Sequence, residues 1–144
     1  PWDRNRALWG GFVVQAEDGA SVYFAGDSGW CPHFAEIGAR FPRLDIALLP
    51  IGAYEPRWFM RTQHMDPDEA VRAHLALGAR RSLGMHFGTF AGLTDEAIDA
   101  PEAALAVARL EHGVPAEAFG TLPFGATLEL EAGGVRPERA ATSA

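Results

Sequence analysis

Cysteine is nearly missing from this chain of 144 residues, and Cys31, the single one present, has no partner for a disulfide within the chain. One cysteine also excludes a cysteine-rich zinc module, and it favours an intracellular protein, for which we expect a cytoplasmic location. Long hydrophobic runs are missing too, because no stretch approaches the roughly 18 to 20 apolar residues of a membrane helix. No leader with a charged and then an apolar part opens the chain, so we expect neither a transmembrane segment nor a signal peptide.

Basic residues are few, since 12 Lys and Arg stand against 19 Asp and Glu and give a formal charge of −7. Phosphate backbones are bound by clustered Lys and Arg, so we do not expect nucleic acid as a partner. Hydrophobic residues make up 48% of the chain, which is enough for the core of one domain at this length.

Strand-like and helix-like segments alternate, which predicts an α/β fold with a mixed sheet. Asp66 is expected to cap a helix over 66–78 with Glu69, and Asp99 with Glu102 predicts a second capped helix over 99–113. A shorter helix is expected at 34–41, and Asp18-Gly19 predicts a hairpin turn between the first two strands. The strands are expected at 8–15, 21–26, 45–51, 81–87 and 126–131, and the polar segment 132–144 is expected to be a disordered tail.

The stretch "YFAGDSGW" admits two chemistries, one at Ser28 and one at Asp27. Its Gly-Asp-Ser-Gly also surrounds the nucleophilic serine of chymotrypsin-like proteases. That fold is all-β, however, and it places a histidine base before the serine, whereas no histidine precedes Ser28 here. The nucleophile-elbow pattern Gly-x-Ser-x-Gly is missing as well. We therefore interpret Ser28 as a turn hydroxyl, and Asp27 as either an Asx-turn residue or a metal ligand.

Three polar side chains would meet at one edge of the sheet if its central strands are parallel. Asp27 directly follows the strand expected at 21–26, His86 ends the strand at 81–87, and His64 lies in the loop after the strand at 45–51. Ligands of α/β sheets collect beyond the carboxyl ends of the strands. A histidine within an apolar strand is also typical of a core residue, so the spacing alone leaves both interpretations of His86 open.

Five segments in one order carry a resemblance to a known family: "LWGGFVV", "VYFAGDSGW", "DIALLPIGAYEPRWFM", "QHMDPDEAV" and "MHFGTF". Together they resemble the C-terminal half of the N-acylphosphatidylethanolamine phospholipase D-like branch of the metallo-β-lactamase superfamily. The similarity is close over residues 2–95 and looser beyond. It implies an αββα sandwich of two halves, of which residues 1–131 would be the second, with a mixed sheet covered by helices on one face.

The resemblance also implies roles for particular residues. Asp27 would bridge two metal ions, usually zinc with other divalent metals as alternatives, and His86 would bind the second ion. His64 would lie beside the metals as a catalytic residue, with Gln63 next to it at the substrate. A hydroxide shared by the metals would attack phosphorus in a small-molecule or lipid phosphodiester. Tyr54 and Trp30 are expected to form apolar walls for an acyl chain, although aromatic residues are as often part of a core.

One motif of the family, His-x-His-x-Asp-His, does not occur in these 144 residues. Because zinc sites normally take three or four protein ligands, we expect the isolated chain to be inactive without an N-terminal half. We also expect it to need that half as a partner, or to self-associate, because one face of its sheet would be uncovered. Contact with a membrane surface is compatible with a lipid substrate. The sequence leaves three functions open: a phosphodiesterase, a hydrolase of lactones or other esters with the same fold, and a non-catalytic α/β module without metals.

Overall fold

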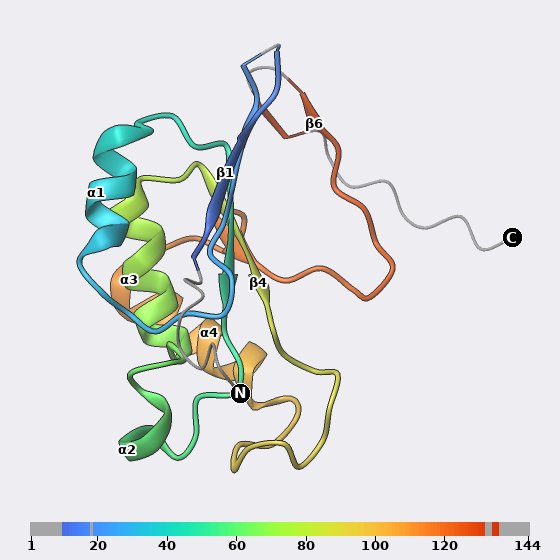
Figure 1. Cartoon of the computed structure of the whole chain (residues 1–144). Helices are drawn as coiled ribbons and strands as arrows, with labels where there is room; N and C mark the ends of the chain where they lie inside the picture. The colour runs from blue at the N-terminus through green and yellow to red at the C-terminus, as the bar shows by residue number, and fades with distance from the viewer. Residues whose placement is uncertain (1–9, 18, 132–133, 136–144) are drawn as a thin grey trace, which may run out of the picture.

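A five-stranded mixed sheet forms the centre of the molecule in the computed structural model, which describes residues 10–17, 19–131 and 134–135 (Figure 1). β1 pairs antiparallel with β2, and β2, β3, β4 and β5 run parallel in that order. The strands are β1 (Phe12–Gln15), β2 (Ser21–Phe24), β3 (Ile46–Pro50), β4 (Arg81–Met85) and β5 (Phe119–Gly120). The parallel arrangement of the strands that precede Asp27, His64 and His86 is therefore confirmed.

Helices cover one face of this sheet, as the sequence predicted (Figure 1). They are α1 (His33–Arg40), α3 (Pro67–Leu77) and α4 (Ala100–His112), while the short α2 (Arg57–Met60) lies in the loop after β3. The core between helices and sheet is apolar and includes the fully buried Phe34, Leu49, Val71 and Phe119. No helix among the described residues is long and apolar enough to span a membrane.

The two long helices begin differently, although the sequence predicted the same cap for both. In α3, the Asp66 carboxylate accepts from the Glu69 N–H at 2.8 Å and the predicted capping box is complete. Asp99 takes a helical backbone conformation, and its side chain makes no capping hydrogen bond within the described chain, so the second capping box was wrong. A capping residue normally has an extended backbone, which Asp99 lacks. The Glu102 carboxylate instead accepts from the Thr121 hydroxyl at 2.6 Å.

The end of the chain departs from the predicted strand at 126–131. Only Leu130–Glu131 is extended there, as β6, and it pairs with β7 (Gly134–Val135) in a separate two-stranded sheet. The main sheet is instead closed by the two-residue β5, which is too short to show a strand pattern. β7 lies within the expected tail, whose other residues, like Asp18 of the predicted turn, are outside the described part of the chain.

The second face of the sheet is only partly covered. The chain after β5 runs along this side, opposite α1 and α3 (Figure 1). Three large side chains of β1 and β2 nevertheless stay exposed: Phe12 at 67%, Val14 at 63% and Phe24 at 40%. Phe12 pairs with Phe24 across the two strands, so these side chains form one continuous apolar surface, which we call the open sheet face.

Candidate metal centre

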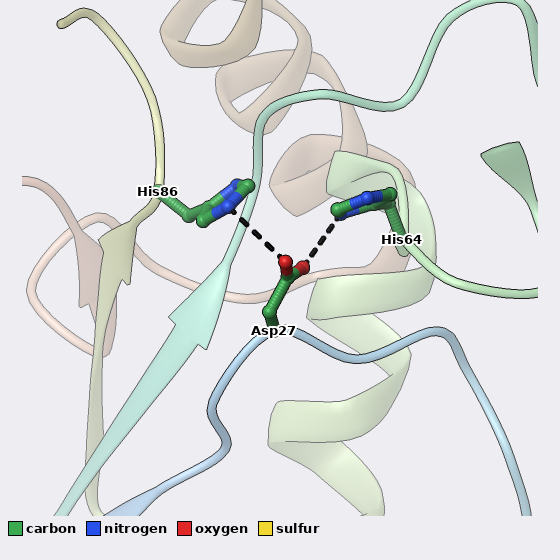
Figure 2. Close-up of side chains that lie close together, drawn as sticks. All are labelled: Asp27, His64 and His86. Carbon is green, nitrogen blue, oxygen red and sulfur yellow. Dashed lines mark ion pairs between the residues drawn. The ribbon is translucent and has the colours of Figure 1, made fainter. Parts of the chain in front are cut away.

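The carboxyl ends of β2, β3 and β4 bring Asp27, His64 and His86 together (Figure 2). One ligand atom from each of them lies within 4.8 Å of the others. Nδ1 of His64 is 2.7 Å from one carboxylate oxygen of Asp27, and Nε2 of His86 is 3.6 Å from the other oxygen. The two imidazole rings stack with their centroids 5.4 Å apart. The sequence predicted this edge of the sheet, but not that His64 would lie as close to Asp27 as His86 does.

Asp27 and His86 are each presented by a sharp change in the backbone. Gly26, with a φ of 70°, turns the chain after β2 so that Asp27 leaves the strand direction. His86 itself has a φ of 62°, a left-handed conformation that is uncommon for residues other than glycine. Such conformations cluster at functional sites, where the surrounding structure enforces them.

The loop after β3 supports His86 through its backbone. A Cβ atom at Gly52 would lie 2.4 Å from the carbonyl oxygen of His86, so only glycine permits this approach. Glu96, which follows His86 in the next loop, accepts from the backbone N–H groups of Tyr54 and Glu55 at 3.3 and 3.0 Å. Burial opposes ionisation of Glu96, but hydrogen bonds to its carboxylate outweigh burial and lower its pKa. A carboxylate thus ties the two loops together.

The donor set fits a divalent cation. One carboxylate and two imidazoles are ligands that zinc and related metals accept. Nδ1 of His64 is buried and, despite its closeness to Asp27, is not in hydrogen-bonding geometry with any described group. A buried ring nitrogen without a hydrogen bond is costly unless another partner satisfies it. Asp27, His64 and His86 are thus a group of described side chains that could hold a metal ion.

The other expected site residues are not members of the cluster of Asp27, His64 and His86. Gln63 is exposed beside His64. Trp30 stacks on Phe34 at 5.6 Å, and the Arg72 guanidinium lies over its ring, so it packs against the helical layer. Tyr54 is 9% exposed, and burial, followed by the charge of nearby carboxylates, raises its pKa.

Ser28 shows no sign of an activated nucleophile. Its hydroxyl oxygen is buried and has no hydrogen-bond partner among the described residues, whereas a serine nucleophile needs an adjacent base. Its backbone carbonyl accepts from the N–H of Met65 at 3.1 Å, which docks the Asp27 turn against the His64 loop. This contact agrees with the interpretation of Ser28 as a turn residue.

An apolar cavity of about 540 Å³ adjoins His86. Residues of β3 and β4 on the sheet face opposite the helices form its floor, and the segment after β5 and the loop after β4 form its walls. Its lining includes Leu48, Leu83, Met85, Phe87, Leu122 and Phe124. The sequence did not predict this cavity, because its walls come from segments that are distant along the chain and carry no common pattern.

Comparisons with known proteins agree with this architecture. The chain is 48% identical over 89 residues to N-acyl-phosphatidylethanolamine-hydrolyzing phospholipase D 1 of Caenorhabditis elegans, and the match covers 61% of this chain and 25% of that protein. A UPF0173 metal-dependent hydrolase of Methylacidiphilum infernorum is 40% identical over 81 residues, with 56% and 31% covered. The chain thus spans about a quarter to a third of the length of these relatives.

A solved structure shows the same fold. The metallo-β-lactamase fold protein YhfI of Bacillus subtilis superposes with a TM-score of 0.54 at 17% identity, over 78% of this chain and 40% of that one. Residues 1–87 match the model of the beta-lactamase superfamily domain. Because that match covers more than half of the chain and the fold agrees with it, this chain belongs to the beta-lactamase superfamily domain family, whose relatives found here include metal-dependent hydrolases.

Proposed function

We propose that this chain forms part of a metal-dependent phosphodiesterase that acts on a lipid phosphodiester. The observation that carries the proposal is the cluster of Asp27, His64 and His86 at the carboxyl edge of the sheet (Figure 2). One ligand atom from a carboxylate and from each of two imidazoles within 4.8 Å of the others favours a metal-dependent hydrolase over a non-catalytic module. The name of the Caenorhabditis elegans relative supports the choice of reaction.

Asp27 and His86 are the residues that we propose as ligands, with Asp27 able to offer one oxygen to each of two ions. A divalent metal such as zinc, when bound, supplies a Lewis acid that activates water and stabilises negative charge on a phosphoryl oxygen. Further ligands would have to come from beyond the described residues, because two or three side chains do not complete a two-metal site.

His64 is the residue that we propose to act on the substrate. Its side chain is only 15% exposed and faces the carboxylate of Asp27 from the side opposite His86 (Figure 2). In its protonated form the imidazole can donate to the leaving oxygen or to a phosphate oxygen. The N-terminus of α3 follows two residues later and adds a favourable field for an anion.

The apolar cavity beside His86 supports a substrate with an acyl chain. Ligand cavities of roughly 300 to 1,000 Å³ are usually apolar with a few polar groups, and here the polar residues of the lining include His86 of the cluster and Glu96. The exposed Phe90 and Leu93 belong to the same lining, and Trp58 and Phe59 of α2 are also exposed. We propose that these residues touch a membrane surface when a lipid enters.

The test compares Asp27→Asn with Ser28→Ala in the longest natural form of the protein. We expect Asp27→Asn to lose bound zinc, measured by elemental analysis, and to abolish hydrolysis of bis(4-nitrophenyl) phosphate. Ser28→Ala should keep its zinc and most of its activity. Loss of activity in Ser28→Ala with zinc retained would contradict the proposal, and a parent protein that cleaves lactones but no phosphodiester would contradict the choice of substrate.

A further inference from the structure

The loop between β3 and α3 carries a motif, "PIGAYEPRWFM", that the metal centre does not use directly. We propose that Arg57 in this motif is a positioning residue that fixes His64 at the metal centre, an inference that rests on the function proposed above. Its guanidinium group donates to the backbone carbonyl of His64, and no described hydrogen bond or ion pair joins it to the side chains of Asp27, His64 or His86. Arg57 would therefore act through the placement of His64 and not on the substrate.

Arg57 contacts His64 through the backbone. Nη1 of Arg57 donates to the carbonyl oxygen of His64 at 2.9 Å and to that of Tyr54 at 3.3 Å. The N–H of His64 donates in turn to the carbonyl oxygen of Met60 at 2.8 Å, and Met60 is the last residue of α2, the helix that Arg57 begins. Both backbone polar groups of His64 are thus held by one short segment.

Arg57 is itself anchored to the first turn of α3. Nη2 is 2.7 Å from a carboxylate oxygen of Glu69, and Nε is 3.2 Å from one of Asp66. Glu69 is buried, and the capping box fixes both carboxylates at the first turn of α3. A buried carboxylate needs a charged partner, so Glu69 gives Arg57 a rigid attachment to the helix that packs against the sheet.

Only arginine can make all of these contacts at once. Its planar fork presents several donors in fixed directions, whereas the ammonium group of lysine is a single point charge on a flexible stem. Replacing Arg57 with lysine can preserve one ion pair, but not the bonds to Asp66, Glu69 and His64 together. We therefore expect the lysine variant to fold and yet to leave His64 less well placed.

Arg61 provides a matched control. Its Nε is 3.4 Å from the other oxygen of Glu69, so Arg61→Ala removes a positive charge from the same carboxylate. The Arg61 side chain is 71% exposed, and no described contact joins it to the carbonyl of His64. An effect of charge alone should appear in both variants, whereas an effect of positioning should appear only at Arg57.

The experiment measures the imidazole signals of His64 and His74 by NMR in the metal-free protein, in its longest natural form. Arg57→Lys and Arg57→Ala should shift and broaden the His64 signal and leave that of His74 unchanged. Arg61→Ala should leave both unchanged. With zinc bound, Arg57→Lys should lower kcat for bis(4-nitrophenyl) phosphate roughly 10-fold or more with little change in KM, because a misplacement of about 1 Å can cost about 10²-fold.

The NMR result tests the positioning role even if the protein hydrolyses no phosphodiester. A His64 signal that is the same in the wild type and in both Arg57 variants would overturn the inference, as would equal changes in the Arg57 and Arg61 variants. Circular dichroism establishes that each variant is folded. If Arg57→Ala does not fold, the comparison of Arg57→Lys with Arg61→Ala decides whether Arg57 positions His64.

Discussion

At the scale of single residues, the position of His64 raises a choice that the sequence did not raise. The family resemblance implied a catalytic histidine beside the metals, yet its Nδ1 lies closer to Asp27 than the Nε2 of His86 does. A histidine in this place can either donate a proton to the substrate or bind a metal. If His64 is replaced by alanine, the first role predicts a loss of turnover with zinc retained, and the second predicts a loss of zinc.

We predict that His64→Ala slows turnover by about 10²-fold or more, a usual contribution of a general acid or base, while the zinc content stays unchanged. Turnover of bis(4-nitrophenyl) phosphate and elemental analysis of the same sample provide the measurement. His86→Ala is the comparison, because there we expect zinc to be lost. Loss of zinc from His64→Ala would instead make His64 a metal ligand.

At the scale of elements, the site depends on how the loops after β3 and β4 touch. The backbone at Gly52 runs so near the carbonyl oxygen of His86 that it leaves no room for a Cβ atom, and the Ile51 N–H donates to the carbonyl of Met85 at 3.0 Å just before it. Both contacts lie directly beside the left-handed residue His86. Small changes in the β3 loop should therefore be felt at the metal centre.

We predict that Gly52→Ala weakens metal binding although residue 52 is not a ligand. The added Cβ would lie 2.4 Å from the His86 oxygen, so the backbone of one loop must move. Overpacking of this kind usually costs about 1–3 kcal/mol of stability, and we expect zinc affinity to fall by roughly tenfold, as about 1.4 kcal/mol would give.

The measurement is a zinc titration by calorimetry together with a thermal melt. Gly10→Ala is the matched control, because a Cβ at Gly10 would meet no atom of the described chain within 4 Å. Unchanged zinc affinity in Gly52→Ala would show that the His86 loop adapts without cost to the metal centre.

At the scale of the whole molecule, the open sheet face stays largely exposed in the part of the chain that the structure describes. Soluble monomers rarely leave more than a few hundred Å² of contiguous apolar surface exposed. The consecutive apolar residues of β3 predicted a sheet buried on both sides, and the helices bury only one. An αββα sandwich would place a second sheet against this surface.

We predict that the 144-residue chain alone self-associates or binds a hydrophobic dye at micromolar concentration. Light scattering and dye fluorescence measure the two outcomes, and Phe12→Ser with Val14→Thr should reduce both. Leu110→Ser is the control, because Leu110 is 83% exposed on α4 and lies outside the open sheet face. A monomer that folds cooperatively and binds no dye would contradict this prediction.

The sequence by itself determined the α/β class, the boundaries of α3 and the edge of the sheet where Asp27, His64 and His86 meet. It could do so because these features depend on local signals: a capping box and polar residues directly after apolar strands. Only the tertiary structure decided the exact neighbours. The pairing of β5, the engagement of Glu102 by Thr121 and the anchoring of Arg57 by Glu69 join residues that are 12 or more positions apart. Such contacts depend on how the elements pack, and no local pattern encodes that.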